Sequence, residues 1–191
     1  MKKIGVGIIG FGTVGTGVVK ILKKNKASLR QQIGADLELK KIADLDIKTD
    51  RGVKLPNGIL TKDAEVLLND PDIDIVVELI GGIEFAKKFI IKALNKGKHV
   101  ITANKALLAE HGLEIYRAAA KNSVDLAFEA SVAGGIPIIR AMQESFVSDR
   151  VTGFSGILNG TSNYILSRMT DEGGEFKYIL NDDQKQGYAE A

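Results

Sequence analysis

A glycine-rich turn near the N-terminus constrains the fold of this chain more than any other feature. The motif Gly10-Phe11-Gly12-Thr13-Val14-Gly15 follows an apolar run over residues 4–9 and opens an amphipathic stretch that reaches Leu22. In a strand-turn-helix with this spacing, the three glycines form the tight turn, let the backbone approach a pyrophosphate, and allow the helix to pack closely on the strand. The sequence therefore predicts a dinucleotide site, with the positive end of the helix facing the phosphates. The alternative is an ordinary strand-turn-helix whose glycines serve packing alone.

Two helical stripes of apolar residues are predicted to pack against the core. After the motif, apolar residues recur at i, i+4, i+7 and i+8: Val14, Val18, Ile21 and Leu22. Further along, apolar residues recur every four positions: Phe85, Phe89 and Ala93. This spacing places side chains on one face of a helix, and we expect both faces to lie on a sheet. The second stripe is given no functional role.

Composition excludes several kinds of chemistry. The 191 residues are 45% hydrophobic and 26% charged, which describes a soluble globular chain with room for one sizeable core and part of a second. The formal net charge is +2, without long blocks of one sign, so we expect neither a nucleic acid nor a membrane as partner. The chain has no cysteine, which excludes disulfides and a thiolate nucleophile. It has two histidines, too few to form a cluster of ligands for a transition metal. Without a signal peptide or a membrane span, the predicted location is cytoplasmic.

Alternating strand and helix patterns predict the fold class. Apolar, strand-like runs recur at about residues 4–9, 37–43, 73–80, 98–102 and 124–129. Segments of helical length separate the later runs, and the third run is nearly continuous in apolar residues, as expected of a parallel strand buried on both faces. The sequence predicts an α/β protein with a Rossmann-type, doubly wound, mostly parallel sheet. Ligands of such sheets bind in the crevice outside the carboxyl ends of the strands.

Residues directly after the second and third runs are candidates for cofactor binding. Asp44 follows the second run, where a carboxylate can accept hydrogen bonds from the adenosine ribose. It favours NAD, because it would repel the 2′-phosphate of NADP, although Lys48 and Arg51 nearby could accommodate that phosphate. The alternative for Asp44 is a solvated turn carboxylate. Gly81 and Gly82 follow the third run and would let the cofactor approach the backbone closely.

Lys105 is the candidate residue after the fourth run. It ends the segment Thr102-Ala103-Asn104-Lys105 and would bring an ammonium group to the mouth of the crevice. We expect it to bind or polarise a substrate beside the site of hydride transfer. The alternative is an ordinary surface lysine.

The pattern changes beyond the fifth run, which predicts a second domain. A strand end runs into Gly134, Gly135 and Pro137, and the proline could start a helix. A helix is predicted from Ile138 to Phe146, then a strand over 151–158 and a helix capped by Thr161 or Ser162. We place the dinucleotide-binding domain at residues 1–134 and the start of an α+β substrate domain at residues 135–191.

Together these motifs resemble the N-terminal part of a homoserine dehydrogenase. The resemblance is carried by six segments at residues 10–15, 78–82 (Glu-Leu-Ile-Gly-Gly), 102–105, 129–137 (Glu-Ala-Ser-Val-Ala-Gly-Gly-Ile-Pro), 156–164 (Gly-Ile-Leu-Asn-Gly-Thr-Ser-Asn-Tyr) and 187–191 (Gly-Tyr-Ala-Glu-Ala). The last three are distinctive of that family. The resemblance implies an oxidoreductase that acts on a CH-OH group, interconverting L-homoserine and L-aspartate 4-semialdehyde with NAD or NADP. That reaction belongs to threonine, methionine and isoleucine biosynthesis.

The resemblance also implies roles for individual residues. Cofactor contacts are assigned to the glycine-rich turn and to a residue near the C-terminus: Gly10, Phe11, Gly12, Thr13, Val14, Gly15 and Gly187. Lys105 is expected near the nicotinamide and the substrate, and Glu190 is expected to bind the homoserine ammonium. A monovalent cation, Na⁺, is expected to be held largely through carbonyl oxygens, which suit a hard cation. Its residues are Glu129, Val132, Gly134 and Ile136.

The family pattern continues beyond the end of this sequence. In the family, a substrate-binding aspartate and the lysine taken to be the acid/base catalyst follow the position of Glu190 closely, whereas the sequence ends at Ala191. We therefore expect a truncated substrate and dimerisation domain, with cofactor binding but little turnover, because hydride transfer from an alcohol needs a positioned base. The full-length protein is expected to be a homodimer. Two alternatives stay open: a dinucleotide-binding sensor without catalysis, and another small-molecule NAD(P) dehydrogenase.

Overall fold

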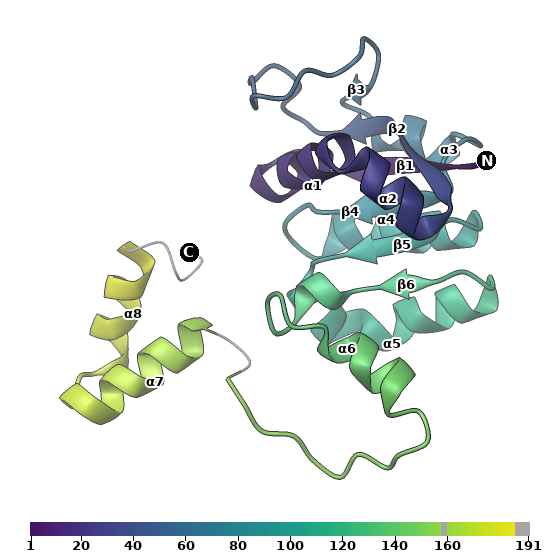
Figure 1. Ribbon diagram of the computed structural model, residues 1–191. Coiled ribbons are helices and arrows are strands. Elements are labelled where there is room, and N and C mark those ends of the chain that lie inside the picture. The colour runs from purple at the N-terminus through teal and green to yellow at the C-terminus, as the bar shows by residue number, and fades with distance from the viewer. Residues whose placement is uncertain (158–159, 186–191) are drawn as a thin grey trace. The chain divides into compact units, whose positions relative to one another are not determined.

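The chain forms two compact units, a first unit over Met1–Ser131 and a second unit over Val132–Ala191. The computed structural model describes residues 1–157 and 160–185 (Figure 1). The domain boundary predicted at residues 134 and 135 lies close to this division and stays a prediction.

The first unit is built on a six-stranded parallel sheet with strand order β3-β2-β1-β4-β5-β6. Its strands are β1 (Lys2–Ile9), β2 (Ala35–Ala43), β3 (Leu60–Thr61), β4 (Ile75–Glu78), β5 (His99–Thr102) and β6 (Leu126–Ala127). The chain moves outward from β1 to β3 and then returns to β4 on the other side of β1. This reversal is the switch point at which such sheets bind ligands. The predicted doubly wound α/β fold is confirmed.

Helices cover both faces of this sheet. The first unit contains α1 (Thr13–Lys24), α2 (Lys26–Ile33), α3 (Ala64–Asn69), α4 (Glu84–Asn95), α5 (Lys105–Lys121) and the 3₁₀ turn η1 (Glu129–Ser131). Figure 1 shows α1 and α2 in front of the sheet. Neighbouring strand residues enter different cores: Ile8 and Val77 join the cluster on the α1 side, and Ile9 and Val76 join the cluster with α3, α4 and α5. The alternation is the one expected of strands buried on both faces.

The predicted core face of α1 is wrong in part. Val14 and Ile21 are mostly exposed, whereas Gly15, Thr16 and Val19 are buried. The contact of Gly15 with the turn sets the rotation of the helix, because a Cβ there would lie 2.1 Å from the carbonyl oxygen of Gly10. Residues spaced from Gly15 by four and seven positions therefore face the sheet.

The predicted core stripe on α4 is also wrong in part. Ala93 is fully buried, but Phe85 is 67% exposed. The core face of the helix instead includes Ala86 and Ile90, each one position after a phenylalanine. The spacing of the stripe correctly predicted a helix. The face that packs on the sheet is rotated by about one residue from the predicted face.

The second unit is helical in its described residues. It contains α6 (Ile138–Arg140), the π-helical turn η2 (Ala141–Ser145), α7 (Gly160–Glu172) and α8 (Phe176–Lys185). The first two elements confirm the helix predicted from Ile138 onward. Helices α7 and α8 pack on each other, and the Arg168 guanidinium donates to Asp182 over 2.6 Å.

The strand predicted over 151–158 is wrong for residues 151–157, which adopt no regular structure, and residue 158 lies outside the described residues. Val151, Phe154 and Ile157 are exposed there. A strand needs a neighbour to pair with its backbone, and the described part of the second unit contains no other strand. None of the helices in the described ranges has the length and apolar character that a membrane span requires.

Candidate functional site

The three glycines of the turn have different surroundings. Gly10 has φ +102°, and a Cβ there would lie 2.6 Å from the carbonyl oxygen of Leu79. Gly15 packs against Gly10, whereas nothing lies within 4 Å of the position that a Cβ on Gly12 would take. Gly10 and Gly15 are therefore needed for the fold of the turn, and Gly12 leaves the backbone open on the crevice side. This is the arrangement in which the middle glycine meets a pyrophosphate.

The N-terminus of α1 is suited to an anion. Gly12 is the N-cap residue and has no side chain to cap the helix, and the first turn contains no acidic residue. The first amides of an α-helix have no partner within the helix, and the helix dipole adds positive potential there. Phosphate oxygens can accept hydrogen bonds from these amides, and their negative charge is stabilised by the helix dipole.

A crevice of about 600 Å³ lies at the carboxyl ends of β1, β2 and β4. It brings together four of the residues predicted to bind cofactor: Gly10, Gly12, Asp44 and Gly81. Of the other turn residues, Phe11 and Gly15 are buried beneath the surface and Val14 is exposed. Thr13 lines a second, smaller pocket, to which Gly12 also contributes. Contact of any of these residues with a cofactor stays a prediction.

Asp44 is bound to the turn itself. Its Oδ2 accepts from the amide of Phe11 over 2.5 Å, and its Oδ1 accepts from the amide of Asp46 over 2.8 Å. The side chain therefore fastens the end of β2 to the glycine-rich turn, and its predicted contact with a ribose stays a prediction. Sequence reasoning missed this bond, since Phe11 and Asp44 are 33 residues apart.

Arg51 lies beside the same carboxylate. Its guanidinium is 3.8 Å from Asp44, 3.3 Å from Asp46 and 5.0 Å from the centre of the Phe11 ring. Hydrogen bonds from the Thr49 side chain and then from backbone amides lower the pKa of Asp46 to about 2, so this carboxylate is charged at neutral pH. The guanidinium is thus held by acidic groups and an aromatic face. Lys48, the other cation considered for a 2′-phosphate, is exposed.

A buried carboxylate joins the loops that follow β4 and β5. Glu78 is fully buried; its Oε2 accepts from the Thr102 hydroxyl over 2.6 Å and its Oε1 from the Ile80 amide over 2.8 Å. Thr102 in turn accepts from the amide of Asn104 over 3.0 Å, and the Asn104 side chain donates to Gly82 over 2.7 Å. Burial raises the pKa of Glu78, against the lowering effect of its two hydrogen bonds. Sequence reasoning gave Glu78 no role, although an acidic residue in an apolar strand was a usable signal.

Lys105 is the first residue of α5. Asn104 caps this helix by accepting from the amide of Leu107 over 3.1 Å. Lys105 is exposed at the edge of the sheet where β5 ends, and it lies outside the lining of the crevice. Its predicted role at the active site stays a prediction.

The residues predicted to hold a cation are divided between the two units. Glu129 belongs to η1 of the first unit, and Val132, Gly134 and Ile136 belong to the second. Across residues 1–157 and 160–185, no cluster of three His, Cys, Asp or Glu side chains could hold a metal. That finding does not test carbonyl ligands. Gly187 and Glu190 lie outside the described residues.

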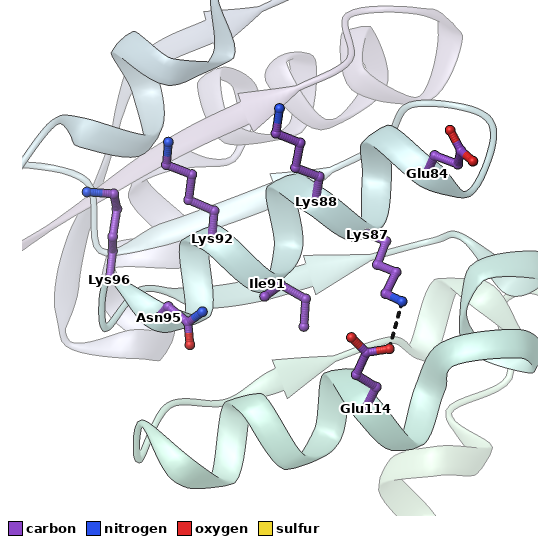
Figure 2. Close-up of a pocket in the computed structure, with 8 residues that line it drawn as sticks. All are labelled: Glu84, Lys87, Lys88, Ile91, Lys92, Asn95, Lys96 and Glu114. Carbon is purple, nitrogen blue, oxygen red and sulfur yellow. Dashed lines mark ion pairs between the residues drawn. The ribbon is translucent and has the colours of Figure 1, made fainter.

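A groove between α4 and α5 differs from the crevice in chemistry. Figure 2 shows a row of lysines along α4 and the ion pair of Lys87 with Glu114, which spans 2.7 Å. Lys92 pairs with Glu65. Hydrogen bonds from these two lysines lower the pKa of Glu114 and of Glu65. The groove contains none of the predicted site residues, and its charges make an ordinary solvated helix face.

Comparison with known proteins agrees with this geometry. Residues 10–129 match the family model described as the NAD-binding domain of homoserine dehydrogenase, and residues 137–191 match the homoserine dehydrogenase model. The chain belongs to the homoserine dehydrogenase family. The predicted resemblance is confirmed, and the first unit is the domain that binds a nicotinamide dinucleotide in this family.

Individual relatives cover the whole chain. It is 46% identical over 191 residues to the homoserine dehydrogenase of Bacillus subtilis (strain 168), covering 100% of this chain and 44% of that protein. It is 43% identical over 191 residues to the enzyme of Neisseria gonorrhoeae, with coverage of 100% and 44%. The crystal structure of a homoserine dehydrogenase from Thiobacillus denitrificans matches with 45% identity and a TM-score of 0.87, covering 100% of this chain and 44% of that one. The chain thus spans less than half the length of these relatives.

Proposed function

We propose that the protein is an oxidoreductase that interconverts L-homoserine and L-aspartate 4-semialdehyde with a nicotinamide dinucleotide. The family match and the doubly wound sheet support this function. The observation that carries it is the open backbone at Gly12, which lies at the uncapped N-terminus of α1 and lines the crevice. A diphosphate bound there would receive helix amides on one side and contact no side chain at Gly12.

NAD is the proposed cofactor rather than NADP. Asp44 lines the crevice, and its carboxylate accepts from the amides of Phe11 and Asp46, which hold it in place at the crevice. Ribose hydroxyls can donate to such a carboxylate, whereas a 2′-phosphate would be repelled. Arg51 is already held by Asp46 and by the ring of Phe11, which reduces its use as a phosphate ligand.

The remaining residues are proposed by family resemblance. A bound nicotinamide dinucleotide would supply the acceptor for the hydride that leaves the carbon bearing the hydroxyl, as the hydroxyl gives up its proton. Lys105 is proposed to bind or polarise the substrate at the mouth of the crevice, and Glu190 to bind its ammonium group. Na⁺ is proposed to lie among carbonyl oxygens of Glu129, Val132, Gly134 and Ile136, which suit a hard cation. Assembly as a homodimer is part of the same proposal.

The proposal is tested with Gly12→Ala and its matched control Gly17→Ala. Both positions have open space where the new Cβ would go, so neither change introduces a clash within the fold. Only the first places a methyl group against the diphosphate. We expect Gly12→Ala to weaken NAD binding about tenfold or more by calorimetry, which corresponds to about 1.4 kcal/mol, and Gly17→Ala to leave binding unchanged.

Activity is measured with the same substitutions in the full-length protein, because the chain described here spans less than half the length of its relatives. Reduction of NAD that depends on L-homoserine should fall in parallel with binding in Gly12→Ala. If Gly12→Ala binds NAD as tightly as the unchanged protein, the diphosphate does not lie at the turn. If NAD binds but L-homoserine supports no reduction by the whole protein, the proposed substrate is wrong.

A further inference from the structure

Helix α4 presents two aromatic rings to the crevice. Phe85 lies in the first turn of the helix and is 67% exposed, and Phe89 lies one turn later and is partly buried against the core. Their ring centres are 6.4 Å apart with a 33° angle between the planes. Both line the crevice that also contains Gly10 and Gly12. A single exposed apolar side chain is ordinary, but a pair of rings facing a ligand-sized cavity is not.

The rest of α4 explains why this position is unusual. One face of the helix is buried through Ala86, Ile90 and Ala93. Another face carries the lysines of Figure 2. Phe89 packs at the border of the core, whereas Phe85 lies on neither the core face nor the charged face and is left mostly exposed.

The residues that line the crevice together with the phenylalanines indicate which part of a dinucleotide would meet the rings. The diphosphate site is at Gly12, and the ribose site at Asp44 lies after β2. The lining that contains Asp44 also includes Leu45, Ala64 at the start of α3, and the two phenylalanines. The nicotinamide end would extend the other way, toward β5, since the two halves of a dinucleotide bind on opposite sides of the switch point.

We propose that Phe85 and Phe89 form a stacking wall for the adenine ring of the cofactor. The proposal rests on the function proposed above and adds two binding residues to it. The adenine ring is uncharged and flat, and its π-face is complementary to an aromatic ring that would otherwise meet water. Leu45 and Ala64 provide the apolar surfaces that would enclose its other sides.

The first test compares the binding of the adenine-containing half of the cofactor with the binding of the nicotinamide half. In Phe85→Ala, the affinities for NAD and for ADP-ribose should fall by the same factor, about tenfold by comparison with other aromatic-base contacts. Binding of nicotinamide mononucleotide should not change. Phe176→Ala is the matched control, because Phe176 is a half-exposed phenylalanine of α8.

Each outcome decides between the proposals. Unchanged ADP-ribose affinity in Phe85→Ala overturns the stacking role while the proposed function stands. An equal loss for nicotinamide mononucleotide also overturns it, because the ring would then act on the wrong half or through the fold. If the unchanged protein binds neither NAD nor NADP, the proposed function fails, and the stacking role fails with it.

A second variant reports stacking directly. The chain has no tryptophan, so Phe85→Trp introduces a single indole fluorophore. Stacking on adenine should quench its fluorescence when ADP-ribose is added. Tyr116→Trp is the control, since Tyr116 lies on α5 with its ring 6.3 Å from that of Phe128 and outside the lining of the crevice. Equal quenching in both variants, or none in either, contradicts the proposal.

Discussion

The two units differ in how many of their large apolar side chains are buried. The first unit buries aliphatic residues on both faces of its sheet. Among the described residues of the second unit, Ile165 and Ile179 are the buried apolar side chains. Large apolar side chains are exposed elsewhere in that unit: Ile136, Phe146, Val147, Phe154, Ile157 and Tyr178. The first unit therefore has a closed core, whereas the described part of the second presents apolar surface of the kind that other protein surfaces cover.

Among the described residues, each unit has one fully buried carboxylate, and the two carboxylates differ in their hydrogen bonds. Glu78 accepts from a hydroxyl and an amide, whereas neither oxygen of Asp183 has a hydrogen-bond partner. A buried polar group without a partner lowers stability by about 1–3 kcal/mol. Burial alone therefore does not show that a carboxylate stabilises the fold. Glu78 joins two loops beside the crevice because both of its oxygens accept hydrogen bonds, whereas Asp183 joins nothing in this way.

The largest predicted effect concerns core packing. Leu67 is fully buried where α3 meets β1. Leu67→Ala should lower the free energy of unfolding by about 3 kcal/mol, because the shorter side chain leaves a cavity that the closed core cannot fill. Ile179→Ala should cost less, about 2 kcal/mol, because Ile165 is the other buried apolar side chain in the described part of its unit and less of a closed cavity is left. Urea unfolding followed by circular dichroism measures both. Equal losses would remove the distinction between the units.

The next effect has opposite signs at the two buried acids. Glu78→Leu leaves the Thr102 hydroxyl and the Ile80 amide without an acceptor and should destabilise the protein by about 2 kcal/mol. Asp183→Leu removes a carboxylate that has no partner and should stabilise it by about 1 kcal/mol. Thermal unfolding of the two variants gives the comparison. A loss of stability in Asp183→Leu would mean that this carboxylate is compensated.

The smallest effect is a pH dependence from Glu78. Because burial raises its pKa in the folded state, the folded protein binds this proton more strongly than the unfolded chain does. Stability should therefore fall as pH rises from about 4.5 through the raised pKa. Asp46, with its pKa lowered to about 2, acts in the opposite direction and below this window. In Glu78→Gln the slope above pH 4.5 should be flatter; parallel unfolding curves for the two proteins would contradict the assignment.

The sheet and the glycine-rich turn could be predicted because their signals are local. Apolar runs, turn residues and the spacing of Gly10, Gly12 and Gly15 each depend on a few neighbouring positions. The same local information failed where a distant contact decides the outcome. The rotation of α1 depends on Gly15 meeting the backbone of Gly10, and residues 151–157 form no strand although their composition allows one.

Part of the candidate site could be found in the same way. Asp44 and Gly81 were predicted in the crevice from their places after strands, and the structure brings them there. The bond from Phe11 to Asp44 and the bridge from Glu78 to Thr102 connect residues 33 and 24 positions apart, so no pattern in the sequence contains them. Phe85 was predicted to lie in the core because helical spacing shows which residues share a face, but not whether that face meets the sheet or the crevice.

The bond between Asp44 and the Phe11 amide has a consequence for protein engineering. One carboxylate holds the shape of the turn and borders the cavity that would receive the ribose. Replacing Asp44 to admit a phosphorylated cofactor would also release the turn, so one mutation would alter selectivity and loop geometry together.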